Sequence, residues 1–272
     1  LVQAWLQETA DLQRLDAHWN CPVDAIEPVH GGWRACDAAG RTMAEAPHVV
    51  VAAALDSLRL LVPHGAPATL PLRPVQGQMS LAALDGPPLA ERPQRDNGVF
   101  VPDYADSGLP PQWPARIWAM GATYARGDTS THSTPEGHEG NALSLKAIHP
   151  QAEQRFRQAA LSGRLLGWAE VRCASLDRLP LAGAVPDTHA LWQRQEGRKD
   201  RHSRSSLADV PRVPGLFMLS ALGSRGITLA HWCAQVVASR IDASPLAFDA
   251  DLLAAIDPAR FAWKQARRQT VA

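Results

Sequence analysis

The chain has 272 residues, of which 46% are hydrophobic and 20% charged, and its 27 basic residues balance 27 acidic ones. This composition excludes general disorder and supplies enough apolar material for one large domain or two small ones. The zero net charge means that a polyanionic partner must be met by local groups, because no global field attracts it. The longest uncharged stretch, residues 226–239, has 14 positions. A membrane helix needs about 18 apolar residues, so we expect a soluble protein that lacks a membrane span.

The cysteines and histidines lack the spacing that metal sites require. No C-x-x-C pair and no H-E-x-x-H motif occurs in the sequence. Zinc knuckles, redox dithiols and zinc hydrolases depend on these spacings, so we predict no metal site. Scattered cysteines are also typical of the reduced, cytoplasmic compartment, and we predict a cytoplasmic protein.

The first seventy residues predict a helix, a small meander and a buried strand. Helical spacing covers residues 1–18, and because the chain opens with Leu1 inside this pattern, we expect a sequence that begins within a domain. Strand patterns follow at 23–29, 33–36 and 42–45, separated by turn signals. The apolar run at 48–53 predicts a strand that is buried on both faces of a parallel sheet.

The middle of the chain predicts a second region with antiparallel strands. Prolines are dense from 63 to 114, and strand patterns occur at 72–84, 98–101 and 116–124. Thr134 followed by Pro135 is a favourable helix start, and two helices are expected to run to about residue 161. A strand is predicted at 166–175, and the polar, arginine-rich stretch 193–214 is expected to form a long exposed loop.

A strand, a glycine turn and a helix form the clearest local motif near the end of the chain. The strand is expected at 216–221, the turn at Gly223-Ser224-Arg225-Gly226, and the helix at 227–239. Free N–H groups and the helix dipole favour negative charge at such a turn. The spacing is neither G-x-G-x-x-G nor G-x-S-x-G, so an anion-binding turn and an ordinary strand-to-helix turn both remain open.

Arg172 is the most informative single residue of the predicted strand at 166–175. It stands between Val171 and Cys173, in a largely apolar segment. A buried arginine either pairs with an internal acid or meets an anionic ligand. The residues by themselves leave both roles open.

Several motifs carry a family resemblance when they are taken together and in order. They are LPLRPVQGQMS, NGVFVP, AMGATYARG, EVRCASLDRLPLAGAVPD, LFMLSALGSRGI and PLAFDADLLAAIDPARFAW, spread over most of residues 45–265. This set resembles the FAD-dependent oxidase half of the bifunctional tRNA 5-methylaminomethyl-2-thiouridine biosynthesis proteins. That half is similar to glycine oxidase and D-amino-acid oxidase.

The resemblance implies a fold of α/β plus α+β type. A split, Rossmann-like FAD-binding domain would comprise residues 1–70 and 176–272, and an antiparallel-sheet substrate domain would comprise residues 71–175. The family's first βαβ unit, with its G-x-G-x-x-G fingerprint, has no counterpart in this sequence. The methyltransferase half has none either. One residue departs from the pattern, since Leu55 follows the buried strand near a position where the family places a glycine.

The resemblance also implies a reaction and a set of site residues. FAD would oxidise the carboxymethylaminomethyl group of the tRNA wobble uridine, giving an imine that water splits into aminomethyluridine and glyoxylate. Arg172 would grip the substrate carboxylate. The remaining implied residues are Tyr124 and Arg126 for the substrate and Gly77, Gln78, Gly223, Ser224, Arg225, Gly226 and Ile227 for the flavin.

Two alternative functions remain open, together with the surface that would contact RNA. The first alternative is a flavin oxidase of a free small amino acid such as glycine or sarcosine, because Arg172 suits any carboxylate. The second is a binding fragment without activity. Candidate tRNA contacts are basic residues in the expected loop and in the C-terminal tail. They are Arg194, Arg198, Lys199, Arg201 and Arg204 in the loop and Lys264, Arg267 and Arg268 in the tail.

Overall fold

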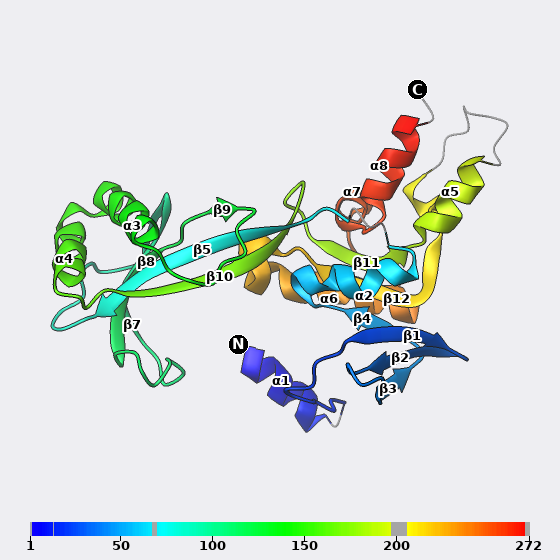
Figure 1. Ribbon diagram of the computed structural model, residues 1–272, viewed down its shortest axis with the longest axis horizontal. Helices are drawn as coiled ribbons and strands as arrows, with labels where there is room; N and C mark the ends of the chain where they lie inside the picture. The colour runs from blue at the N-terminus through cyan, green and yellow to red at the C-terminus, as the bar shows by residue number, and fades with distance from the viewer. Residues whose placement is uncertain (1, 13, 67–69, 197–205, 270–272) are drawn as a thin grey trace.

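The computed structural model describes residues 2–12, 14–66, 70–196 and 206–269, and three β-sheets organise these residues (Figure 1). The smallest unit is an antiparallel meander with strand order β1-β2-β3, formed by β1 (Ala25–Val29), β2 (Gly32–Cys36) and β3 (Thr42–Ala46). The turn signals between the predicted strands therefore do act as turns. The helix α1 (Val2–Asp11) precedes the meander and ends earlier than the predicted residue 18.

The second sheet has the order β11-β12-β4. Its strands are β4 (Val49–Val51), β11 (Leu181–Pro186) and β12 (Arg212–Ser220). The expected parallel pairing is confirmed, because Leu216, Phe217 and Met218 of β12 lie opposite β4 in a parallel register. The expected burial on both faces is wrong for Val50, which is 40% exposed because β4 lies at the edge of the sheet.

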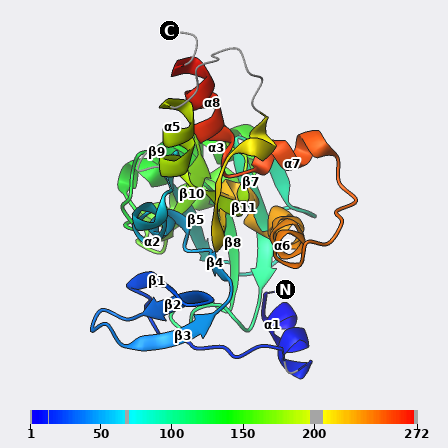
Figure 2. The same ribbon diagram turned by 90° about the vertical axis from the view of Figure 1, so that its right-hand side faces the viewer.

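Helices cover this second sheet and join it to the C-terminal region. The largest is α6 (Gly226–Asp242), whose Cys233, Val236 and Val237 are buried against β11 and β12. The others are α2 (Ser57–Leu61), α5 (Thr188–Glu196), α7 (Ala250–Ile256) and α8 (Arg260–Gln269). Figure 2 shows the β1–β3 meander on one side of this sheet and α5 and α8 on the other.

The third sheet is a six-stranded antiparallel sheet with the order β10-β5-β8-β7-β6, and β9 also pairs with β5. Its strands are β5 (Leu72–Ala83), β6 (Gln94–Asp96), β7 (Gly98–Ala105), β8 (Arg116–Gly121), β9 (Ala125–Arg126) and β10 (Leu166–Ser175). Two helices, α3 (Pro135–Ile148) and α4 (Pro150–Leu161), pack on it. The predicted helix start is confirmed, since the Thr134 hydroxyl accepts a hydrogen bond from the Gly137 N–H.

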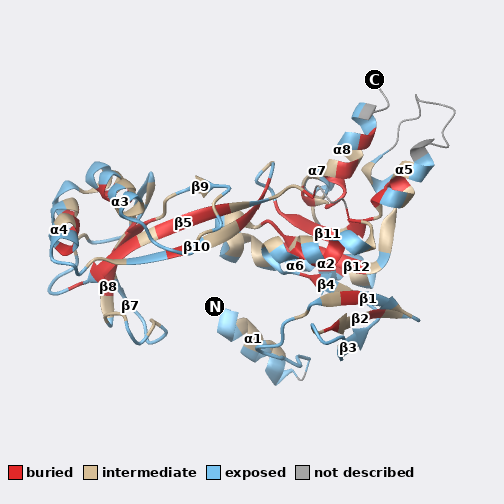
Figure 3. Cartoon of the chain, viewed as in Figure 1, coloured by how far each residue is buried: buried red, intermediate tan, exposed pale blue. Residues whose placement is uncertain are grey.

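The long β5–β10 pair joins the second and third sheets. It runs from the Leu72–Ser175 pair to the Leu81–Leu166 pair, and Figure 1 shows it as a bridge across the molecule. Buried residues are concentrated on β5, β8, β11 and β12, whereas α1 has none (Figure 3). The domain boundaries at 70/71 and 175/176 stay a prediction.

The predicted loop over 193–214 is wrong at both ends, because a helix occupies its first residues and a strand its last ones. Helix α5 continues to Glu196 and β12 already begins at Arg212. Leu191 of α5 packs with Val210 and with Ala262 of α8, so apolar contacts stabilise this part of the fold. Arg198, Lys199, Arg201 and Arg204 of the predicted loop lie outside the described residues.

No helix in the described ranges is long and apolar enough to cross a membrane. Within the same residues, no cluster of three or more histidine, cysteine, aspartate or glutamate side chains has the arrangement of a metal site.

Candidate functional site

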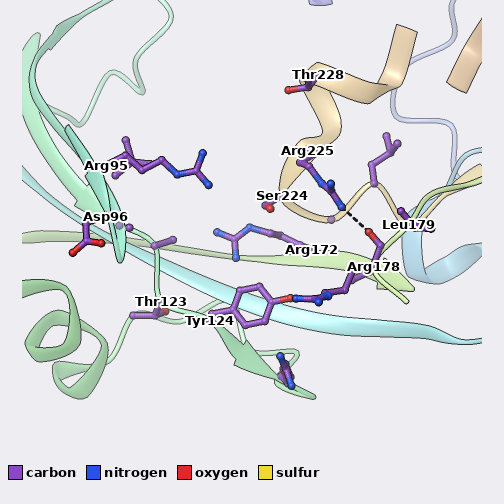
Figure 4. Close-up of a pocket in the computed structure, with 18 of the residues that line it drawn as sticks. Arg95, Asp96, Thr123, Tyr124, Arg172, Arg178, Leu179, Ser224, Arg225 and Thr228 are labelled. Atoms are coloured by element: carbon purple, nitrogen blue, oxygen red, sulfur yellow. Dashed lines mark hydrogen bonds between the residues drawn. The ribbon is translucent and has the colours of Figure 1, made fainter. Parts of the chain in front are cut away.

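A cavity of about 1010 Å³ opens where the third sheet meets the start of α6 (Figure 4). Its walls come from β6 and β7, from the segment around Tyr124, from β10 and from the turn before α6. Five arginines and two aspartates are among its lining residues. This excess of positive charge suits an anionic ligand.

Arg172 lies on β10 and reaches into this cavity. Figure 4 shows the guanidinium groups of Arg172 and Arg95 directed toward its open centre. Nη1 of Arg172 is buried and has no hydrogen-bond partner in the described part of the chain. A buried donor without a partner is costly, so this atom is suited to a ligand oxygen. The alternative is that Arg172 pairs with an internal acid, but no ion pair among the described residues involves Arg172.

Gly77 leaves the space that the guanidinium group of Arg172 occupies. Arg172 lies opposite Val75 of β5, so that Gly77 is its diagonal neighbour on the same face of the sheet. A Cβ atom at position 77 would collide with the guanidinium group. Glycine is therefore required here by the arginine. Gly77 does not line the cavity, and its predicted contact with the flavin stays a prediction.

Gln78 points to the other face of the sheet, toward α3. Its side-chain Nε2 donates to the carbonyl of Thr134 (2.9 Å), and its Oε1 accepts from the Thr134 N–H (2.8 Å). Both ends of the amide are thus used to hold the start of α3. Gln78 is not among the residues that line the cavity, so its predicted flavin contact remains a prediction without geometric support.

The glycine turn lies on the opposite wall from β6 and β7. Gly223 has a φ of +58°, and the single 3₁₀ turn Gly223–Arg225 leads directly into α6. No side chain caps the helix at Arg225, so the first N–H groups of α6 are free to bind an anion. Gly223, Ser224 and Arg225 line the cavity, while Gly226 and Ile227 form the first helical residues beside it.

Tyr124 and Arg126, which the resemblance assigns to the substrate, both line the cavity and are exposed. The guanidinium of Arg126 lies 5.7 Å from the centroid of the Tyr124 ring, within the range of a cation–π contact. Their roles in substrate binding stay predictions.

The turn between β10 and β11 brings residues that sequence reasoning did not single out. Arg178 lines the cavity, and its carbonyl oxygen accepts a hydrogen bond of 2.7 Å from Arg225 (Figure 4). Arg178 belongs to the motif EVRCASLDRLPLAGAVPD, which could have suggested it. Arg95 of β6 had no such signal, because only the folding of the third sheet carries it to the cavity.

Asp177 in the same turn already has a partner. Burial by itself would raise the pKa of its carboxyl group, but hydrogen bonds from Arg260 and Ser175 outweigh this effect and lower the pKa to about 2. Arg260 binds both carboxylate oxygens, at 2.9 and 2.8 Å. This aspartate is therefore ionised and neutralised by the protein, which leaves the cavity arginines available for a ligand.

Leu55 does not protrude from the end of β4. Its side chain packs against the core beneath the second sheet. The residue before it, Ala54, adopts a φ of +50°, a conformation that glycine favours. A backbone conformation that glycine favours therefore occurs at Ala54, directly before Leu55.

The described members of the two predicted RNA-binding segments lie away from the cavity. Arg194 donates a hydrogen bond to the Asp209 carbonyl (3.4 Å). Lys264, Arg267 and Arg268 lie on α8, which packs against α5 and α7. None of these four residues lines the cavity.

Comparisons with known proteins identify the family to which this architecture is related. The sequence profile of a family described as FAD dependent oxidoreductase (DAO) matches residues 1–240. The chain is similar to the tRNA 5-methylaminomethyl-2-thiouridine biosynthesis bifunctional protein MnmC of Ralstonia nicotianae, with 35% identity over 94% of the chain and 37% of that protein. The protein of the same name from Cupriavidus metallidurans is 34% identical over 90% of the chain and 34% of its own length. The chain thus spans about a third of these relatives.

Solved structures show the same fold. Glycine oxidase from Geobacillus kaustophilus has a TM-score of 0.61 at 21% identity, over 88% of this chain and 52% of that one. Iminodiacetate oxidase from Chelativorans sp. BNC1 has a TM-score of 0.62 at 16% identity, over 91% of this chain and 56% of that one. The predicted mixed α/β architecture with an antiparallel sheet is confirmed.

Proposed function

Because the chain belongs to the FAD-dependent oxidoreductase family, we propose that it uses FAD to oxidise the carboxymethylaminomethyl group of the tRNA wobble uridine. The products are aminomethyluridine in the tRNA and free glyoxylate. The name of these relatives, tRNA 5-methylaminomethyl-2-thiouridine biosynthesis bifunctional protein, supports tRNA as the substrate. The word bifunctional is consistent with a partner methyltransferase half that uses S-adenosylmethionine, and tRNA modification is consistent with the cytoplasm.

The cavity fits FAD by the chemistry of its walls. Gly223, Ser224, Arg225, Gly226 and Ile227 would hold the flavin, because the free N–H groups at the start of α6 can stabilise its anionic pyrimidine end. When bound, FAD supplies a two-electron acceptor for the C–H bond of the amine. The remaining task of the protein is to hold the substrate in a reactive orientation.

The unpartnered guanidinium group of Arg172 is the observation that carries the proposal. Its buried, unpartnered Nη1 is suited to one carboxylate oxygen of the substrate, and the planar guanidinium can bind both oxygens. Fixing the carboxylate orients the neighbouring methylene group within the cavity. Oxidation of that methylene gives a C=N bond, which water splits so that the carboxylate-bearing carbon leaves as glyoxylate.

The test measures glyoxylate after the chain is supplied with FAD and carboxymethylaminomethyl tRNA. We expect release by the native chain and a loss of at least about 30-fold in kcat/KM for Arg172→Met, which corresponds to about 2 kcal/mol. Arg172→Lys is expected to recover little, because lysine lacks the planar pair of donors. The matched control is Arg155→Met, since Arg155 is exposed on α4 outside the cavity.

The flavin spectrum and FAD affinity are measured in the same variants. Unchanged FAD binding with lost turnover supports the carboxylate role of Arg172. Absence of glyoxylate from the native chain with bound FAD contradicts the proposal.

A second candidate function is the oxidation of a free small amino acid. The fold shared with glycine oxidase and the generic chemistry of Arg172 favour it. Turnover of glycine or sarcosine without turnover of tRNA would support oxidation of a free amino acid. A chain that stays colourless and takes up no FAD would instead indicate a binding fragment without activity.

A further inference from the structure

A second pocket of about 620 Å³ lies directly beside the Arg172 cavity, and we propose that it binds the phosphate backbone of the substrate RNA. We call it the arginine pocket, after Arg73, Arg126 and Arg178 in its lining. Tyr124 at the shared border would stack on a base of the same RNA. This inference rests on the proposed function, because it names how the macromolecular part of that substrate is held.

The charge of the arginine pocket points to a polyanion. Three of its ten lining residues are arginines and none is acidic. All three arginines are exposed, and no ion pair within the described residues involves them. Unpaired arginines that converge on one pocket are the usual means of binding phosphate oxygens.

The register of the third sheet explains how these arginines converge. Arg172 of β10 and Arg126 of β9 both lie opposite Val75 of β5, on its two sides. Arg73 lies two residues before Val75, and side chains two residues apart on a strand share a face. One face of the β9-β5-β10 ribbon therefore carries Arg73, Arg126 and Arg172. Arg178 joins them from the turn that follows β10.

The two pockets adjoin each other, because four residues line both of them: Tyr124, Arg126, Ala174 and Arg178. Tyr124 is 52% exposed at this border. Unstacked bases of single-stranded RNA loops commonly stack on aromatic side chains flanked by arginine. A modified base that enters the Arg172 cavity would thus place its backbone in the arginine pocket and a neighbouring base on Tyr124.

The length of the ligand distinguishes RNA from a free amino acid and from the flavin. A free amino acid satisfies Arg172 with its carboxylate and has no second anionic group to reach Arg73. The first N–H groups of α6, which would serve the flavin, are on the wall formed by Ser224 and Arg225, and neither of these residues lines the arginine pocket. A phosphodiester chain is long enough to occupy the remaining positive sites.

The experiment measures binding of a fluorescently labelled anticodon stem-loop RNA by anisotropy at several salt concentrations. The test variant combines Arg73→Gln, Arg126→Gln and Arg178→Gln. The matched control combines Arg92→Gln, Arg155→Gln and Arg240→Gln, three exposed arginines that line neither pocket. Each single strand phosphate contact contributes about 0.7 to the slope of log affinity against log salt, so the test variant should reduce the slope by about 2. The control should leave the slope within about 0.5 of the native value.

Tyr124 gives an independent measurement. We expect Tyr124→Ser to weaken RNA binding by about 5- to 150-fold, the range for loss of one stacked base, and Tyr124→Phe to retain binding within about twofold. Equal losses for serine and phenylalanine would show that the hydroxyl group matters rather than the ring, and would overturn the stacking role.

Three outcomes separate this inference from the proposed function. Equal salt slopes for test and control variants overturn the arginine pocket even if the native chain releases glyoxylate. A reduced slope supports the pocket even if no glyoxylate appears, in which case the proposed reaction has failed. If the test variant loses affinity for FAD and keeps its affinity for RNA, the pocket is a cofactor diphosphate site and the inference is wrong.

Discussion

Replacing Asp177 by asparagine should loosen the turn that forms one wall of the candidate site. The carboxylate of Asp177 receives two hydrogen bonds from Arg260 and one from Ser175 (2.8 Å). Arg260 also donates to the Leu179 carbonyl (3.1 Å). This ion pair therefore fixes the β10–β11 turn, and with it Arg178, against the start of α8.

The expected loss of stability follows from two features of the pair. The pKa of Asp177 is lowered to about 2. Relative to an ordinary aspartate at about 3.9, this difference corresponds to about 2–3 kcal/mol of stabilisation at neutral pH. The Arg260 side chain is only 3% exposed, and an unpaired buried charge costs about 3–5 kcal/mol. Because Arg260 keeps its bonds to the carbonyls of Leu179 and Asp257, we expect the lower end, about 3 kcal/mol.

The assay is thermal unfolding followed by circular dichroism at several pH values. At pH 7 the Asp177→Asn variant should have a Tm about 6–12 °C below that of the native chain. A carboxyl group with a lowered pKa stabilises the fold above its unfolded pKa and loses this contribution as pH falls through the folded pKa. The difference in Tm should therefore shrink between about pH 4 and pH 2.

The Asp103–Arg116 pair provides a matched control. It is also bidentate, with distances of 2.8 and 2.7 Å, but its side chains are 31% and 39% exposed. Exposed ion pairs contribute little, so Asp103→Asn should shift Tm far less than Asp177→Asn. Equal shifts for the two variants, or a shift for Asp177→Asn that is the same at pH 7 and pH 2.5, would refute the reasoning.

Three further predictions concern the core and its titratable groups. At pH 8 a thiol reagent should label exposed Cys21 quickly and leave Cys233 unreacted, because burial raises the pKa of Cys233 to about 11; fast labelling of a second native thiol would contradict this. Burial lowers the pKa of His138, so the native chain should lose stability in urea as pH falls below about 6.5, and His138→Gln should reduce this loss. An unchanged pH dependence in that variant would rule out His138 as its source. Leu216→Ala should cost about 2–5 kcal/mol, because Leu216 is fully buried, whereas exposed Leu252→Ala should stay within about 0.5 kcal/mol in the same urea titration.

Local features of this protein were determined by the sequence itself. The Thr134-Pro135 helix start, the glycine turn before α6 and the strand at Leu166–Ser175 all occur where the pattern predicts them. Caps, turns and strand patterns depend on a few neighbouring residues, so they can be read without the fold. The family resemblance likewise rested on short motifs and their order.

The composition of the site was decided only by the tertiary structure. The β5–β10 register places Gly77 beside Arg172, and the third sheet carries Arg95 to the same cavity. The same register turns Gln78 toward α3, where its side chain bonds to Thr134. Neutralisation of Asp177 by Arg260 depends on the docking of α8. These contacts join residues that are distant in the chain, and pairing register and helix docking are set by the whole hydrophobic core, so no local pattern could specify them.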